Sequence, residues 1–155
     1  MSGKASKSWV GFHMPGFIRE RLDRAKAQLE SAKRNLAEGD LETASNRAFL
    51  AAENSASAAI AQAGGRVSPL HKRIRSQFED LCDRGIVPHR FRNTLIESYR
   101  FRLRGNYGRR FHAGRRTPEL KHEAVQGMIR QVSDLISSVE RISRKKESPQ
   151  RSLFC

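Results

Sequence analysis

The fold is decided by one stretch near the amino end, residues 17–38, which reads FIRERLDRAKAQLESAKRNLAE. Its apolar residues recur at alternating spacings of four and three: Ile18, Leu22, Ala25, Leu29, Ala32 and Leu36. This spacing is typical of a helix with one apolar stripe that packs against a core. Charged and polar residues fill the other positions, so the opposite face should lie in solvent. The stretch predicts a helix from Phe17 to about Glu38.

Further helices follow, each bounded by turn residues. They are expected to span residues 41–63, 69–83, 89–104 and 118–144. Ser68-Pro69 and Thr117-Pro118 each read as a helix cap followed by proline at the first helical position. No stretch of useful length alternates apolar and polar residues as a strand does. Because the connections between the long helices are short, the sequence predicts an all-α, antiparallel bundle of four to five helices.

The predicted core consists of one stripe from each helix. The second helix contributes small residues that permit close packing, with bulk from Phe49 and Ile60: Ala44, Ala48, Ala52, Ala56, Ala59 and Ala63. The third contributes Leu70, Ile74, Phe78 and Leu81, and the fourth Phe91, Leu95 and Ser98. The last contributes Ala124, Met128, Val132, Leu135, Val139 and Ile142.

Length and composition bound the class of protein. The 155 residues, 37% of them hydrophobic, fit a single domain. We expect this helical domain to span residues 15–145, between flexible tails at 1–14 and 146–155. No run approaches the roughly 18 apolar residues of a membrane helix. The two cysteines, Cys82 and Cys155, form neither a disulfide framework nor a zinc motif. The sequence thus predicts a cytoplasmic protein without metal or other cofactor.

Positive charge is concentrated in one part of the chain. The formal net charge is +14, and residues 84–116 hold ten arginines, no lysine and one acid, Glu97. Aromatic residues interleave with these arginines, a combination typical of single-stranded nucleic-acid binding. We therefore expect single-stranded RNA as the partner; the alternatives are a solvated basic face and an acidic protein partner. The expected RNA contacts are Arg100, Arg102, Arg104, Asn106, Tyr107, Arg109, Arg110, Arg115 and Arg116.

Arg102 occupies an unusual position in this window. Its spacing places it on the same helix face as Leu95 and Ser98, where a bundle residue is buried. A buried charge without a partner is too costly to persist. Glu53 falls on the apolar side of the second helix, so an internal Arg102–Glu53 ion pair is the structural interpretation. The functional interpretation is an arginine held at a cleft to contact a phosphate, and the two are compatible.

The order of several short motifs resembles the HEPN superfamily. These motifs are Glu38-Gly39-Asp40, Asn46-Arg47-Ala48-Phe49, His71, Arg102-Leu-Arg-Gly105-Asn106-Tyr107-Gly108 and Thr117-Pro-Glu. The arginine motif is most similar to the subgroup with an Arg-x-x-Ala-Asp-Tyr-Gly signature, although Gly105 and Asn106 stand in place of its Ala and Asp. The resemblance covers about residues 17–142.

The resemblance implies a small helical bundle, often a homodimer, from prokaryotic toxin-antitoxin and defence systems. Many members are metal-independent ribonucleases that use an arginine followed a few residues later by a histidine. For this chain it implies Arg102, Arg104 and His112 as catalytic candidates and His71 as an anchor of the third helix. Seven residues separate Arg104 from His112, more than the family's usual spacing.

The expected function is thus that of an RNA-binding protein, either a ribonuclease toxin or a member that does not cleave. The alternative is a non-enzymatic module whose basic face docks an acidic protein, such as a nucleotidyltransferase antitoxin.

Overall fold

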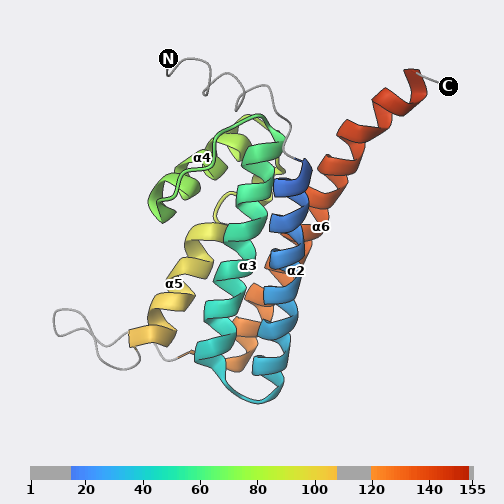
Figure 1. Ribbon diagram of the computed structural model, residues 1–155. Coiled ribbons are helices and arrows are strands. Elements are labelled where there is room, and N and C mark those ends of the chain that lie inside the picture. Colours follow the sequence, from blue (N-terminus) through green and yellow to red (C-terminus); the bar gives the residue numbers. More distant parts are fainter. Residues whose placement is uncertain (1–14, 108–119, 154–155) are drawn as a thin grey trace.

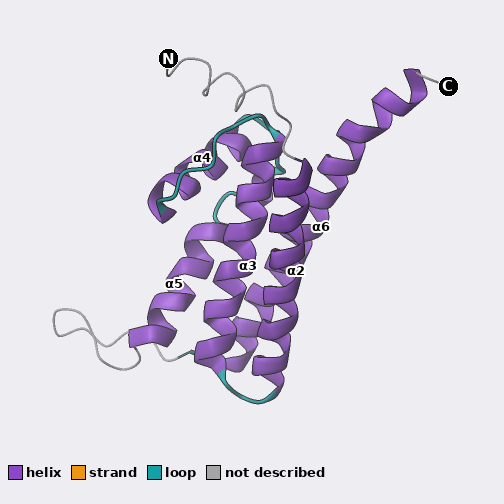
Figure 2. Cartoon of the chain, viewed as in Figure 1, coloured by secondary structure: helices purple, strands orange, loops and turns teal. Residues whose placement is uncertain are grey.

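The computed structural model describes residues 15–107 and 120–153, with side chains for 15–104 and 120–145. These residues form the helices α2 (Pro15–Ala37), α3 (Leu41–Gln62), α4 (His71–Asp83), η1 (His89–Phe91), α5 (Thr94–Tyr107) and α6 (His122–Leu153). Every regular element drawn in Figure 2 is a helix. α2 and α5 run in one direction and α3 and α6 in the other, while α4 lies beside the carboxyl-terminal half of α3 (Figure 1). The prediction of an all-α antiparallel bundle is confirmed.

The apolar stripe of α2 packs as its spacing predicts. All six residues of the stripe are buried: Ile18, Leu22, Ala25, Leu29, Ala32 and Leu36. They face α3 and α6, the two helices against which α2 packs. The helical spacing of the apolar residues in α2 therefore correctly predicts which face of this helix is buried in the core.

Helix α3 is the centre of the bundle. It contacts α2, α4, α5 and α6, so little of its surface reaches solvent. Its alanines from Ala44 to Ala59 are at most 3% exposed, which lets the neighbouring helices approach closely. Asp40 caps the start of α3, where its Oδ1 accepts a hydrogen bond of 3.1 Å from the Thr43 amide. Hydrogen bonding to the Thr43 side chain, and to a lesser extent to this amide, lowers the pKa of Asp40. Gly39 precedes the cap at φ 80°, a backbone conformation that favours glycine.

Helix α4 begins at His71, two residues later than predicted. The Ser68 hydroxyl accepts a hydrogen bond from the Leu70 amide, and the Leu70 carbonyl accepts from the Arg73 and Ile74 amides. Leu70, not Ser68, is therefore the residue before the first turn. The prediction that Leu70 joins the core is wrong: it lies ahead of the helix and is 59% exposed. The burial of Ile74, Phe78 and Leu81 is confirmed.

The region predicted as one helix from His89 to Arg104 contains two elements. A single turn, η1, buries Phe91, and α5 starts at Thr94. The Glu97 amide bonds to the Asn93 carbonyl at 2.9 Å, and asparagine is a favoured residue for a helix start. This boundary makes Thr94 a buried residue of the first turn of α5.

Helix α6 begins at His122, four residues after the predicted start at Pro118, and continues past Arg144. Its buried stripe is Val125, Met128, Ile129, Val132, Leu135, Ile136 and Val139, whereas Ala124, predicted in the core, is exposed. Residues 146–153, predicted as a tail, have a helical backbone. The other predicted tail, 1–14, lies outside the described residues. No helix in the described ranges has the length and apolar character needed to cross a membrane.

Cys82 lies near the end of α4 and is 1% exposed. Burial, with a smaller contribution from neighbouring Asp83, raises the pKa of its thiol to about 11. The thiol is consequently protonated at neutral pH, and Cys82 serves the core as a small apolar residue.

Candidate nucleic-acid interface

The arginine-rich window does not form one surface. Of its six arginines with described side chains, three pair with acids. Arg84 lies 3.3 Å from Asp80, Arg90 4.0 Å from Asp134, and Arg92 2.8 Å from Asp83. These ion pairs compensate the charge of three arginines that are not among the expected RNA contacts.

The arginines of α5 differ from those before it. Among the described residues, Arg100, Arg102 and Arg104 have no acidic partner. The Arg102 guanidinium lies 4.9 Å from the centre of the Phe49 ring, and that of Arg104 lies 5.3 Å from the centre of the Phe101 ring. Stacking on a ring uses the flat face of a guanidinium and keeps its N–H groups available for phosphate oxygens.

These three arginines lie on two sides of α5. Arg100 and Arg104 are four residues apart and share a helix face, whereas Arg102 shares the face of Leu95 and Tyr99 toward α3. Consistent with this placement, Tyr99 and Arg102 both contact Phe49 of α3. Of the predicted RNA contacts with described side chains, only Arg102 therefore faces α3.

The expected ion pair between Arg102 and Glu53 is not formed. Glu53 instead pairs with His71, and Arg102 stacks on Phe49. The reason is the antiparallel packing of α3 and α5, visible in Figure 1. Phe49 faces Tyr99 and Arg102. Because the two helices are antiparallel, Glu53, which lies one turn after Phe49 on α3, faces residues that come earlier on α5. The partner of the Arg102 guanidinium is therefore the Phe49 ring and not the Glu53 carboxylate.

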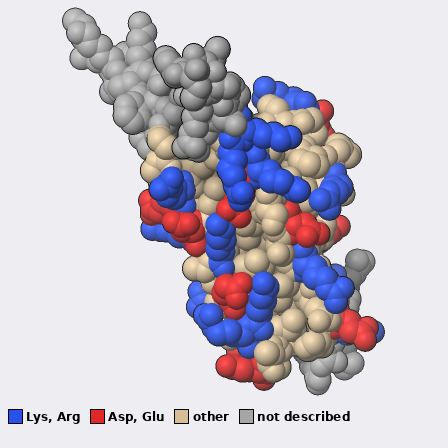
Figure 3. Space-filling model, turned by 90° about the vertical axis from the view of Figure 1, so that its right-hand side faces the viewer, with Lys and Arg blue, Asp and Glu red and all other residues tan. Residues whose placement is uncertain are grey.

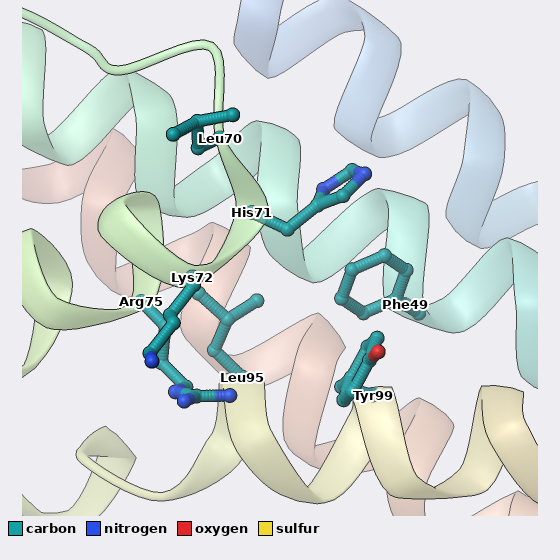
Figure 4. Close-up of a pocket in the computed structure, with 7 residues that line it drawn as sticks. All are labelled: Phe49, Leu70, His71, Lys72, Arg75, Leu95 and Tyr99. Atoms are coloured by element: carbon teal, nitrogen blue, oxygen red, sulfur yellow. The ribbon is translucent and has the colours of Figure 1, made fainter.

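A cavity of about 490 Å³ opens between α3, α4 and α5. Its size is within the usual range of small-molecule sites, about 300–1,000 Å³. Figure 4 shows Phe49, His71 and Tyr99 on one side and Lys72 and Arg75 on the other. The lining residues are Phe49, Leu70, His71, Lys72, Arg75, Leu95 and Tyr99. The cavity thus joins aromatic rings to basic side chains.

The His71 ring is held in place from two directions. Its Nδ1 contacts the Glu53 carboxylate, and its edge packs on Phe49 with the ring centres 5.8 Å apart. The His71 side chain is 58% exposed, whereas that of Glu53 is only 15% exposed. A shielded carboxylate therefore orients an accessible imidazole. The same contact ties the first residue of α4 to α3.

The positive charge at the cavity is only weakly compensated. Arg75 Nε lies 3.6 Å from the Glu79 carboxylate, a long contact within one turn of α4. Lys72 is exposed and has no acidic partner within the described part of the chain. Arg102 adds a third cation beside Phe49. An anion at the cavity would meet the two cations of α4, with Arg102 of α5 beside the Phe49 ring of the cavity wall.

The side of the molecule formed by α2 and α6 has a different character. Figure 3 shows Lys and Arg interspersed there with Asp and Glu. Lys26 of α2 and Glu140 of α6 form an ion pair of 2.6 Å, and Arg144 lies 3.8 Å from the same carboxylate. Local neutralisation makes this side a poorer surface for a polyanion than the cavity.

Several predicted site residues are not placed by the structure. The backbone of Asn106 and Tyr107 is helical, but their side chains are not described. The following predicted residues lie outside the described ranges: Arg109, Arg110, His112, Arg115 and Arg116. Within those ranges, no group of three His, Cys, Asp or Glu residues could hold a metal ion.

Sequence reasoning missed two cationic residues of the cavity, Lys72 and Arg75. They lie three residues apart on α4, a spacing that places both on one helix face. The segment 71–75, which reads HKRIR, carries this signal. It was obscured by the greater density of arginine in the later window.

The pairing of Asp83 with Arg92 predicts a pH effect on stability. The hydrogen bond from Arg92 holds the pKa of Asp83 below its ordinary value of 3.8. A lowered pKa stabilises the fold above pH 3.8, and this contribution is lost as pH falls through the folded-state pKa. We expect Asp83→Asn to lower the thermal unfolding midpoint at pH 7 and to match wild type at the lowest pH. Thermal scans between pH 7 and pH 2 measure both.

The control for this effect is Asp23→Asn, which removes an exposed carboxylate of α2 with no described cationic partner. It should leave the pH dependence unchanged. Equal midpoints for Asp83→Asn and wild type at pH 7 would show that the Arg92 contact does not stabilise the fold.

Comparison with known proteins identifies one family. A family model described as HEPN domain matches residues 18–147. The match begins at the first buried residue of α2 and extends into α6, so it includes the cavity and both helix faces of α5. A search of curated proteins finds no match.

Proposed function

The chain belongs to the HEPN domain family, and from this premise we propose that it binds single-stranded RNA at the cavity between α3, α4 and α5. Phosphate oxygens would bind Lys72, Arg75 and Arg102, and bases would stack on the aromatic side. Base stacking combined with cationic contacts is the usual mode of single-strand binding.

The observation that carries the proposal is an aromatic cavity lined by two weakly compensated cations, Lys72 and Arg75, with Arg102 stacked on the Phe49 ring of its wall. Arg84, Arg90 and Arg92 pair with acids, whereas Arg102 stacks on Phe49 and keeps N–H donors for a ligand. Arginine is well suited to this task because its fork of donors matches phosphate geometry. Arg100 and Arg104, on the other face of α5, would contact a strand that continues around the helix.

The narrower predictions remain part of this proposal. A toxin in a toxin-antitoxin or defence system, a homodimer and a nucleotidyltransferase-type antitoxin were each implied by the resemblance. The antitoxin is also the acidic partner of the alternative, in which the same cations bind carboxylates. The two functions differ in their ligand and are separated by direct binding measurements.

The salt dependence of RNA binding tests the proposal. We expect a labelled single-stranded RNA to bind at low salt, with affinity that falls linearly with salt on logarithmic axes. Each phosphate contact removed should reduce that slope by about 0.7. Arg102→Gln and Arg75→Gln should each produce this change, measured by fluorescence anisotropy in EDTA at several salt concentrations.

The matched control is Arg19→Gln, which removes the same charge from an exposed site on α2. Helix α3 separates α2 from α5 (Figure 1), so this variant should keep the wild-type slope. A parallel loss in Arg19→Gln would indicate general attraction by net charge instead of a site. If RNA does not bind at low salt while an acidic protein does, the alternative function is correct.

A further inference from the structure

We propose that the cavity between α3, α4 and α5 takes the end of an RNA strand, and that Lys72 and Arg75 hold a terminal phosphate monoester there. This inference rests on the proposed function, because it names the part of the RNA that the cavity binds. A terminal phosphate can belong to the 5′ end or the 3′ end of a strand, and the chemistry of the group is the same at both.

Lys72 and Arg75 bring two positive charges to one part of the cavity. Both residues line it, and Figure 4 shows them on the same side of it. They lie three residues apart on α4, a spacing that makes their side chains neighbours on the helix surface. Like charges at neighbouring positions of a helix repel each other. A ligand that carries two negative charges would relieve this repulsion.

The nearby carboxylates leave most of this charge uncompensated. Lys72 has no acidic partner among the residues whose side chains are described. The Glu79 carboxylate lies 3.6 Å from Arg75 Nε and 3.7 Å from Arg92 Nη2, so two arginines share one acid. On the opposite wall, the carboxylate of Glu53 is engaged by His71. The Lys72–Arg75 pair is therefore available to an anion.

A phosphate monoester matches this pair better than the phosphodiester of an internal nucleotide does. A phosphodiester carries one negative charge, whereas a monoester carries about 1.5 to 2 negative charges at pH 7 and has three acceptor oxygens. The Arg75 guanidinium and the Lys72 ammonium can therefore donate to different oxygens of one group. Hydrogen bonds in which both partners are charged are stronger than those between neutral groups.

The size and lining of the cavity fit one nucleotide at the end of a strand. Its volume of about 490 Å³ is that of a small-molecule site. Proteins that follow a continuous single strand use a groove instead, which covers about 4–16 nucleotides in one OB fold. A terminal nucleotide enters a cavity with only one connection to the rest of the strand. Across from the two cations, Tyr99 offers a partly buried ring on which a base can stack.

The test compares strands of one RNA sequence that end in a 5′-phosphate, in a 3′-phosphate or in hydroxyl groups only. We expect a terminal phosphate to tighten binding about tenfold, the usual contribution of one further charge-assisted hydrogen bond. The two phosphorylated strands show which end the cavity takes. Converting the preferred terminal phosphate to its methyl ester leaves one charge and should remove the preference. Fluorescence anisotropy at a fixed salt concentration measures each dissociation constant.

Variants of α4 assign the preference to the cavity. Lys72→Gln and Arg75→Gln should each bring the ratio of the two dissociation constants, hydroxyl strand to phosphorylated strand, closer to one. Arg102→Gln should weaken the binding of both strands alike, because Arg102 does not line the cavity. The matched control is Arg73→Gln, which removes an exposed cation of α4 that does not line the cavity and should keep the wild-type ratio.

Other outcomes overturn the inference in distinct ways. Equal affinities for phosphorylated and hydroxyl strands would remove it and leave the proposed function in place. A preference that survives both Lys72→Gln and Arg75→Gln would mean that the terminal phosphate binds elsewhere. An equal loss of preference in Arg73→Gln would indicate attraction by the net charge of α4 instead of a site. If none of the strands binds at low salt, the proposed function fails first and the inference fails with it.

Discussion

Phe49→Ala is expected to lower the free energy of unfolding by about 3–5 kcal/mol, the usual cost of removing a buried phenyl ring. Phe49 is 1% exposed and lies where α3 meets α4 and α5. Its ring contacts His71, Tyr99 and Arg102, so the substitution removes the support of two residues that line the cavity and of the arginine beside them. Urea denaturation measures the loss of stability.

The same variant should also bind RNA more weakly. The control is Phe78→Ala, because Phe78 is equally buried on α4 but does not line the cavity. Both variants should lose similar stability, whereas only Phe49→Ala should weaken RNA binding, because the Phe49 ring supports His71, Tyr99 and Arg102. Measurements at a temperature where both are folded separate the two effects, and Phe49→Leu serves if the alanine variant does not fold. Equal affinities would show that the ring supports the fold alone.

Leu135→Ala is expected to cost about 2–5 kcal/mol of unfolding free energy. Leu135 is fully buried in the middle of α6, which packs against both α2 and α3. A cavity at this position weakens two helix contacts at once. The midpoint of urea denaturation should fall while the slope of the transition stays unchanged.

The control for Leu135 is Ile142→Ala on the same helix. Ile142 is only partly buried, near the end of the packed part of α6, so its replacement should cost less. Equal losses from the two variants would mean that α6 is packed as firmly at its extension as in its middle.

The fold was largely predictable because helical periodicity is a local signal. The spacing of Ile18, Leu22 and Leu29 identifies both a helix and its buried face. The starts of α4 and α6 were missed by two and four residues, because a proline marks where a helix is allowed to begin. Hydrogen bonds to Leu70 decide where α4 does begin, and these depend on three-dimensional packing.

The site was less predictable because its members come from three helices. Glu53, His71 and Arg102 were all identified from the sequence, yet Glu53 and Arg102 were paired with each other. The correct pairing depends on how far α5 is displaced along α3, and no pattern within either helix records that displacement. The contact that does form, between Arg102 and Phe49, could be predicted only by knowing that α3 and α5 are antiparallel.

The protonated, enclosed thiol of Cys82 makes the chain its own reporter of local opening. Only thiolate reacts readily with alkylating reagents, so modification of Cys82 has to wait until α4 separates from the core. In a chain with Cys155→Ser, the rate of alkylation would therefore report how often α4 separates from the core. Helix α4 also carries His71, Lys72 and Arg75, so a ligand bound in the cavity would slow the alkylation of Cys82. The alkylation rate would therefore report whether the cavity is occupied, although Cys82 does not line it.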